Sequence, residues 1–158
     1  MRFLEDIVVG ERRELGSHRF TAEDIKSFAV RYDPQPFHLD EEAAARSHFG
    51  GLIASGWHTA AAFMRAFVEA ERRLAAEMAA RGEPAARIGP SPGFRGLKWL
   101  KPVRAGDTVS YASEVLEKRP LESRPGWGVL VVRNTGTNQD GVLVFEFEGA
   151  LFVERRPL

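Results

Sequence analysis

An aspartate and a histidine lie close together in a segment that two prolines stiffen. The segment reads "DPQPFH", so Asp33 and His38 bracket Pro34 and Pro36. A carboxylate and an imidazole suit general acid–base catalysis, because imidazole titrates near neutral pH and the carboxylate can share the same water. Five residues of extended chain could separate the two side chains by roughly 15 Å, so this chemistry requires the backbone to bend between them. The structural alternative is that Asp33 ends a helix in a turn and that His38 is an ordinary surface or core histidine.

Gly56 is the second candidate for a chemical role. It stands at the start of a long Ala-rich run, where the dipole of a helix would strengthen its backbone N–H as a donor to a negatively charged oxygen. Glycine also lets the backbone approach a ligand closely. An ordinary loop glycine is the alternative. The neighbouring Ser55 and Trp57 are candidate substrate-binding residues, with packing as the alternative for Trp57.

The composition excludes several function classes. The chain has 158 residues, of which 44% are hydrophobic, and its 22 basic residues balance 22 acidic ones, so we expect one soluble globular domain. A balanced charge provides no field that would gather nucleic acid or an anionic membrane. The absence of cysteine rules out disulfides, thiol nucleophiles and Cys-ligated zinc, and it is consistent with a cytoplasmic location.

Neither a membrane span nor a metal site is expected. Glu5 and Asp6 interrupt the N-terminus before the apolar core of a signal peptide can form. Charged residues also interrupt the helical run at 57–81, which is therefore not a membrane span. The three histidines that recur every ten residues from His38 to His58 share neither a helix face nor a strand face, which argues against a metal site.

Hydrophobic spacing and turn signals divide the chain into helices followed by strands. Thr21 is a good N-cap for a helix at 22–32, and Pro34 ends that helix because the residue before a proline avoids the helical conformation. The other expected elements are a first strand at 14–20, a short helix at 39–47, a long helix at 57–81 and strands at 94–103, 107–119, 126–138 and 141–155.

This order of elements predicts an α+β domain in which a curved antiparallel sheet wraps around the long central helix. We expect the last four strands to form a meander, with Asp140 and Gly141 in the final hairpin turn. The segment "KPVRAGD" would join the first two strands of that meander. Such a sheet has edges to protect, which favours a homodimer or a larger homo-oligomer.

The sequence resembles the MaoC-like dehydratases, the family that includes the (R)-specific enoyl-CoA hydratases. The resemblance covers nearly the whole chain, so we expect a single domain at 1–158. It is carried by "DIVVGE", by "DPQPFHLDEEAAARSHFGGLIASGWHTAA" and by "LKWLKPVRAGDTV". The resemblance implies a hotdog fold and a dimer that binds acyl-CoA near the subunit interface. It also implies that Asp33 and His38 handle the water and that the Gly56 N–H holds the thioester oxygen.

The sequence departs from the usual motif of the family at several positions. Gln35 stands where an Asn is usual, and Arg31 and Tyr32 stand where Ser and Gly usually precede the aspartate. Met64 occupies a position at which better-known members have a serine, so the resemblance makes Met64 a further candidate substrate-binding residue. The acid–base pair is intact, so these changes bear on the pocket and on the identity of the substrate.

The function implied by the resemblance is reversible addition of water to a 2-enoyl-CoA thioester. The reaction needs no metal or redox cofactor, and CoA enters as part of the substrate. The nearest alternative enzyme is a hotdog acyl-CoA thioesterase, which would attack the thioester carbon itself. The alternative from another class is a non-catalytic acyl-CoA-binding module that retains the fold.

A run of basic residues lies on one predicted strand and the turn that follows it. A solvated face is the simpler interpretation of this run, and contact with the phosphates of CoA is the alternative. The run consists of Arg95, Lys98, Lys101 and Arg104.

Overall fold

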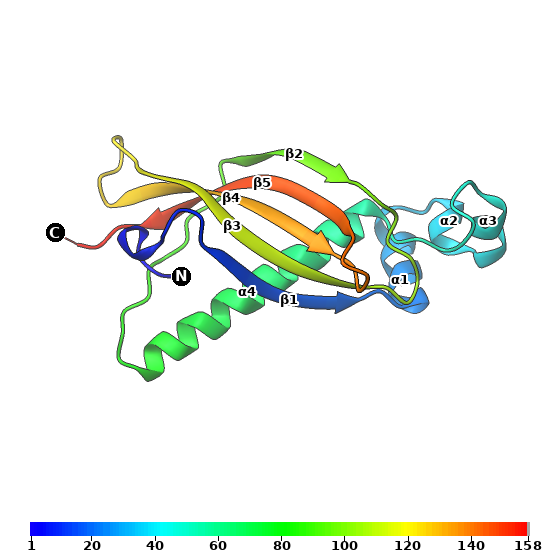
Figure 1. Cartoon of the computed structure of the whole chain (residues 1–158), viewed down its shortest axis with the longest axis horizontal. Coiled ribbons are helices and arrows are strands. Elements are labelled where there is room, and N and C mark those ends of the chain that lie inside the picture. The colour runs from blue at the N-terminus through cyan, green and yellow to red at the C-terminus, as the bar shows by residue number, and fades with distance from the viewer. Residues whose placement is uncertain (158) are drawn as a thin grey trace.

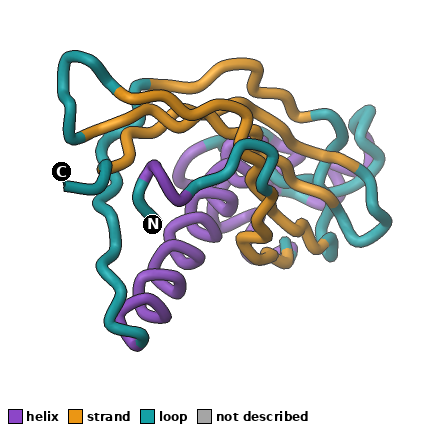
Figure 2. The backbone as a smooth tube through the Cα atoms, turned by 60° about the vertical axis from the view of Figure 1, so that its left-hand side comes forward, coloured by secondary structure: helices purple, strands orange, loops and turns teal. Residues whose placement is uncertain are grey.

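One long helix, α4 (Gly56–Ala80), crosses the concave side of a five-stranded antiparallel sheet in the computed structural model, which describes residues 1–157 (Figure 1). Figure 2 shows the sheet as one layer over the helix. In chain order the other elements are η1 (Leu4–Asp6), β1 (Arg12–Arg19), α1 (Ala22–Tyr32), α2 (Pro36–Leu39), α3 (Glu41–Arg46), β2 (Gly93–Trp99), β3 (Thr108–Pro120), β4 (Trp127–Thr137) and β5 (Leu143–Glu154). The predicted α+β architecture, with a curved sheet around a central helix, is confirmed.

Helix α4 begins one residue before its predicted start. Ser55 is its N-cap, and the Ser55 side chain accepts a hydrogen bond from the N–H of Trp57. Small alanines on the buried face allow the helix to approach the sheet closely. The ring of Phe63 projects from this face and meets the rings of Tyr111 on β3 and Phe145 on β5, with centroids 5.9 and 6.0 Å away. These aromatic contacts form the centre of the core.

The strand order is β1-β3-β4-β5-β2, so the prediction of a four-strand meander is wrong. Strands β3, β4 and β5 form a meander, but β2 pairs with β5 at the far edge and does not pair with β3. The reason lies in the link after β2. The N–H of Leu100 bonds to Val144 O, and Val103 O accepts from the N–H of Ala54, so the link crosses the end of the sheet toward the start of α4. Strand β2 itself ends at Trp99, and Pro102 has no N–H with which to extend the ladder.

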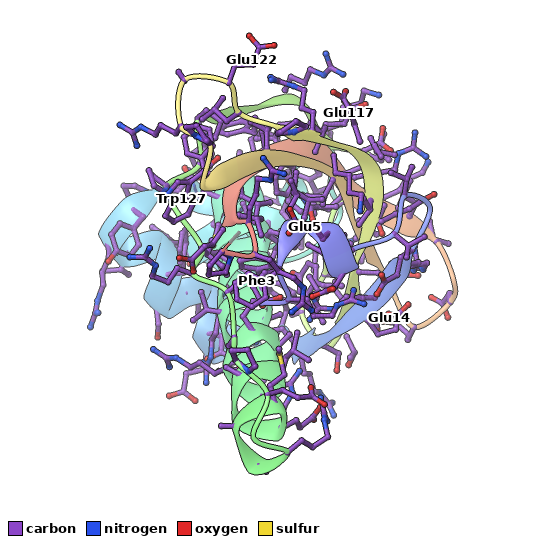
Figure 3. The ribbon with its side chains drawn as sticks, turned by 90° about the vertical axis from the view of Figure 1, so that its left-hand side faces the viewer. Phe3, Glu5, Glu14, Glu117, Glu122 and Trp127 are labelled. Carbon is purple, nitrogen blue, oxygen red and sulfur yellow. The ribbon has the colours of Figure 1, made fainter. Side chains whose placement is uncertain are left out.

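The curvature of the sheet places its two faces in different surroundings. Figure 3 shows the strands arching over α4, with Glu117 of β3 on the outer side.

Asn138 and Gly141 close the β4–β5 hairpin, where Gly141 has a positive φ of 75°. This turn is the one expected at Asp140-Gly141.

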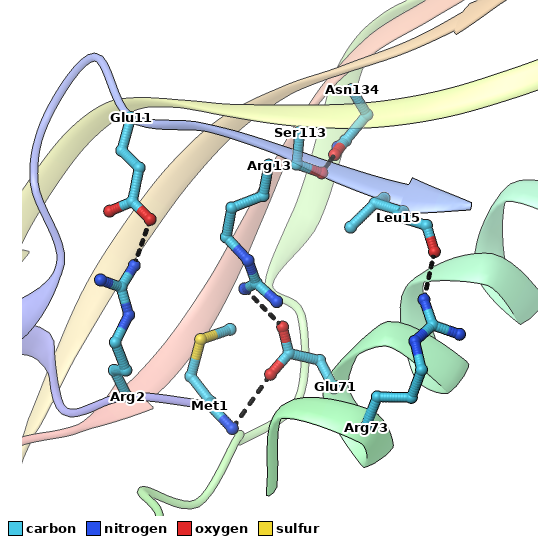
Figure 4. Close-up of polar contacts among 9 residues, drawn as sticks. All are labelled: Met1, Arg2, Glu11, Arg13, Leu15, Glu71, Arg73, Ser113 and Asn134. Carbon is cyan, nitrogen blue, oxygen red and sulfur yellow. Dashed lines mark hydrogen bonds and ion pairs between the residues drawn. The ribbon is translucent and has the colours of Figure 1, made fainter. Parts of the chain in front are cut away.

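The second half of α4 is anchored to β1 by a buried carboxylate. Glu71 is only 7% exposed, and it pairs with the Met1 amino group at 3.0 Å and with Arg13 of β1 at 2.7 Å (Figure 4). Arg73 donates to the carbonyl of Leu15 on the same strand. A buried carboxylate that loses one partner is costly, so these contacts fix the position of the helix under the sheet.

The start of α4 is held by aromatic packing. His58 stacks on Phe28 of α1, with ring centroids 4.6 Å apart and an interplanar angle of 5°. It also meets the edges of Phe20 and His18. Burial lowers the pKa of His58 to about 4, and the neighbouring His18 adds to this effect. His58 therefore serves as a neutral packing residue that joins α1, β1 and α4.

No helix among residues 1–157 combines the length and the apolar character that crossing a membrane requires. Large apolar residues are nevertheless exposed on the surface, among them residues of α4 and of the edge strand β2. Trp57, Met64 and Val68 share one face of α4 and are 55%, 53% and 38% exposed, and Phe94 on the edge strand β2 is 62% exposed. Exposed apolar side chains and an edge strand whose outer side has no partner in this sheet both favour association with a second copy of the chain.

We expect the protein to be a dimer at micromolar concentration. Sedimentation equilibrium should give a mass of about twice the 17.6 kDa of one chain. Val68→Glu should shift the equilibrium toward monomer because it puts a charge on the exposed apolar face of α4, whereas Glu69→Gln leaves that face unchanged. A wild-type protein that sediments as a monomer would contradict the prediction.

We also expect His58 to make stability fall in mild acid. Its pKa is lower in the folded chain than its ordinary value of 6.5, so the unfolded chain binds the proton more tightly. The His58 contribution is therefore fully present above pH 6.5 and is lost as the pH falls from 6.5 toward 4. Chemical unfolding at pH 7.5 and pH 5.0 should show a loss from His58 of about 2 kcal/mol.

The variant His58→Leu isolates this contribution because it cannot titrate. Its stability should change less between the two pH values than that of the wild type, whatever its absolute stability. The exposed His48 offers the matched control His48→Gln, which should keep the wild-type pH dependence. Equal pH dependence in wild type and His58→Leu would refute the assignment.

Candidate active site

Asp33 and His38 are brought together by a single turn of helix. Asp33 caps the C-terminus of α1, and its N–H bonds to the carbonyl of Ala29 at 3.0 Å. Pro36 then takes the first position of the short helix α2, where its missing N–H costs nothing. A helix rises only about 1.5 Å per residue, against about 3.3 Å for a strand, so the turn shortens the path between the two side chains. As a result, His38 Nε2 lies 3.3 Å from Asp33 Oδ2.

The backbone fixes the orientation of the His38 ring. His38 is 4% exposed, and its Nδ1 lies 2.8 Å from the carbonyl oxygen of Ile53. A carbonyl can only accept, so Nδ1 carries a proton and donates it. In neutral His38 the other ring nitrogen, Nε2, is then an acceptor that faces a carboxylate oxygen. Two acceptors at this separation need a proton between them, either on Nε2 or from a bridging water, so the pair is arranged to share a mobile proton.

Two side chains hold the Asp33 carboxylate. Ser55 Oγ donates to Oδ2 at 2.6 Å, and Gln35 Nε2 donates to Oδ1 at 2.8 Å. Partial burial opposes ionisation, but the hydrogen bonds from Ser55 and Gln35 and the charge of His38 outweigh it and lower the Asp33 pKa. Asp33 is therefore an anion near neutral pH. Ser55, predicted to bind substrate, contacts the carboxylate and the start of α4.

Gly56 is the first residue of α4. Among the hydrogen bonds within residues 1–157, none is donated by the Gly56 N–H. The indole of Trp99 packs against this residue, and its Nε1 donates to the Gly56 carbonyl at 2.8 Å. A Cβ at position 56 would lie 2.7 Å or less from three atoms of the Trp99 ring. Glycine is therefore required at position 56 because the Trp99 ring fills the space of a side chain. The Gly56 N–H is not used in this contact and remains free for a ligand.

These groups share one pocket of about 430 Å³. Asp33, His38 and Gly56 all line it, and so does Trp57, which is 55% exposed. The remaining lining residues come from the α2 region, the loop before α4 and its first turn, the end of β2 and the link after it, and β5. They are Gln35, Phe37, Phe49, Ile53, Ala54, Ser55, Thr59, Trp99, Leu100, Lys101, Pro102, Val103 and Val144.

Met64 is not among the residues that line this pocket. It lies two turns into α4 on the exposed face of the helix, beside the face that contains Phe63. Eight residues of helix span about 12 Å along the axis, so Met64 lies about two turns beyond Gly56 and the start of α4, where the pocket is. Trp99 and the link 100–103 do line the pocket, although the motif around Asp33 did not indicate them.

A second pocket of about 460 Å³ lies over β2, β3 and β5, where Arg95 pairs with Glu148 at 2.7 Å. It lacks a histidine, and its charged residues neutralise each other, so we assign the chemistry to the pocket that contains Asp33. In the described part of the chain, residues 1–157, no group of three or more His, Cys, Asp or Glu side chains is arranged to hold a metal ion.

The chain matches one protein family and several known proteins. The family is described as "MaoC like domain", and the match covers residues 7–131. Two curated relatives align over most of the chain. YdeM of Bacillus subtilis, which is uncharacterized, is 32% identical over 152 residues, 96% of this chain and 99% of its own. The 3-hydroxybutyryl-CoA dehydratase of Methylorubrum extorquens is 33% identical over 125 residues, 77% of this chain and 69% of its own.

Solved structures agree with these relationships. The MaoC-like dehydratase from Rhodospirillum rubrum is 42% identical, with a TM-score of 0.85 and coverage of 100% of both chains. Rv0216 of Mycobacterium tuberculosis, which has a double hotdog fold, matches 98% of this chain and 44% of its own with a TM-score of 0.77. At 17% identity, this second likeness concerns the fold alone. The chain belongs to the MaoC-like domain family and has the hotdog fold.

Proposed function

We propose that the protein adds water reversibly to a 2-enoyl-CoA thioester. The observation that supports this most strongly is that Asp33, His38 and Gly56 line one pocket. His38 Nε2 and Asp33 Oδ2, 3.3 Å apart, line the same pocket as Gly56, whose N–H has no partner among residues 1–157. The similarity to a 3-hydroxybutyryl-CoA dehydratase, at 33% identity, points to the same thioester chemistry.

Hydration of an enoyl thioester requires one carbon–oxygen bond, two proton transfers and stabilisation of a negatively charged oxygen. The oxygen of water forms a bond to C3 of the enoyl group while the water loses a proton, C2 gains a proton, and the thioester oxygen carries negative charge in between. The Asp33–His38 pair accepts the first proton and supplies the second, so it ends in its starting protonation state. Dehydration is the same sequence in reverse.

The free N–H of Gly56 is the group that would stabilise the thioester oxygen. It lies at the first position of α4, a helix of 25 residues, where the helix dipole favours negative charge. A donor of this kind contributes typically about 2.7–4 kcal/mol to stabilisation of the transition state. As proposed, the reaction uses two side chains and one backbone N–H, without a metal or redox cofactor.

A direct assay distinguishes this activity from its two alternatives. The protein is incubated with crotonyl-CoA, and the absorbance of the conjugated enoyl group is followed together with the release of free thiol. Loss of absorbance without thiol release supports hydration. Thiol release supports the thioesterase, and neither change supports a binding module.

The roles of Asp33 and His38 are tested by Asp33→Asn and His38→Ala. Each variant should lower kcat by roughly 10²–10⁴, about 3–5 kcal/mol, because it removes proton transfer. The double variant should fall little further, because the two residues act as a unit. Binding of butyryl-CoA, a saturated analogue, should change little in Asp33→Asn, since it depends on Gly56 and the pocket walls.

The fold should survive Asp33→Asn, because an amide oxygen can still accept the Ser55 hydrogen bond and the Asp33 side chain is 18% exposed. Asp140→Asn, at the exposed β4–β5 turn, removes a carboxylate away from the pocket and should keep wild-type turnover. Circular dichroism checks the folded fraction of each variant. If Asp33→Asn unfolds the chain while its folded remainder turns over normally, the DPQPFH segment is a structural turn and the catalytic assignment is wrong.

A further inference from the structure

The pocket that contains Asp33 and His38 has a single cationic side chain in its lining, and that residue is Lys101. Lys101 belongs to the basic run noted in the sequence, but the structure separates it from the other three members. Arg95 pairs with Glu148 at 2.7 Å, and Lys98 pairs with Glu146 at 2.8 Å. The Arg104 guanidinium donates to the carbonyl of Phe49.

Within residues 1–157, no carboxylate lies within 4.0 Å of the Lys101 ammonium, and its side chain makes no hydrogen bond. An exposed lysine is usually a solvated charge, so the absence of a partner does not by itself mark a site. The second observation is its position. Lys101 is exposed and lines the same pocket as His38, which is 4% exposed, so the pocket joins a solvent-accessible lysine to a buried histidine.

The backbone on both sides of Lys101 is fixed. The N–H of Leu100 bonds to the carbonyl of Val144 at 2.8 Å, and the carbonyl of Val103 accepts from the N–H of Ala54 at 2.8 Å. Pro102 restricts the chain between these two bonds. The backbone of Lys101 is therefore held in place between β5 and the residues just before α4.

We propose that Lys101 binds the phosphate groups of the CoA portion of the substrate. This inference rests on the proposed function, which places the acyl thioester at Asp33 and His38 and so directs the rest of CoA toward the mouth. The CoA nucleotide carries a diphosphate and a 3′-phosphate, and lysine binds phosphate as a compact positive charge. With no competing carboxylate nearby, the Lys101 charge is available to attract and hold these anions.

Truncated substrates test this role directly. Crotonyl-CoA carries the phosphates, whereas crotonyl-pantetheine keeps the thioester and the amide arm but has none. Lys101→Gln should raise KM for crotonyl-CoA roughly fivefold, as expected for one exposed ion pair, and Lys101→Glu should raise it further. Neither variant should change kcat, and neither should change KM for crotonyl-pantetheine.

Lys98→Gln is the matched control, because Lys98 belongs to the same basic run but pairs with Glu146 outside the pocket. It should leave KM for both substrates at the wild-type value. Added salt should also raise the wild-type KM for crotonyl-CoA and reduce the difference between wild type and Lys101→Gln.

Two outcomes would overturn the proposal. Either Lys101→Gln leaves KM for crotonyl-CoA unchanged, or it raises KM equally for crotonyl-pantetheine, which would locate the contact on the amide arm or make the effect structural. If wild-type protein hydrates neither substrate, the proposed function fails, and calorimetric binding of butyryl-CoA and butyryl-pantetheine replaces KM. A loss of affinity in Lys101→Gln that is confined to butyryl-CoA still supports the phosphate contact, and equal affinities for wild type and variant refute it.

Discussion

The hydroxyl of Ser55 makes two hydrogen bonds on which the geometry of the site depends. It donates to Asp33 Oδ2 at 2.6 Å and accepts from the N–H of Trp57 at 3.2 Å. The first bond orients the carboxylate, and the second caps the helix whose first residue carries the free N–H. Ser55 is only 1% exposed, so bulk water has little access to replace either bond. Ser55 thus ties the Asp33 carboxylate to the first turn of α4, and with it to the free N–H of Gly56.

Local sequence signals predicted the elements of the fold better than their arrangement. Thr21 and Pro34 set the limits of α1 through capping and the restriction before proline, and the structure gives the expected span of Ala22–Tyr32. Alternation of apolar and polar side chains identifies a strand but does not determine which strand it pairs with. For this reason the pairing of β2 with β5 was missed: it depends on the contacts of Leu100 and Val103 with distant segments.

The same limit applies to the candidate site. The motif identified Asp33 and His38, but their approach depends on α2, a single turn too short to produce a helical pattern. Trp99 and Lys101 enter the pocket from a segment about 60 residues further along the chain, and no local pattern links them to Asp33. Met64 was a candidate because better-known members of the family have a serine at its position, and within one chain it lies on the exposed face of α4, outside this pocket.

The contact between Gly56 and Trp99 also constrains how the sequence can diverge. The Trp99 ring occupies the volume that any larger residue at position 56 would need, and its N–H bonds to the Gly56 carbonyl. The tolerance of position 56 to mutation is therefore set by the residue at position 99, which lies 43 residues away. Loss of Trp99 must come first along any viable evolutionary route to a side chain at position 56. The two positions form an epistatic pair, and substitutions at them should co-vary among homologues.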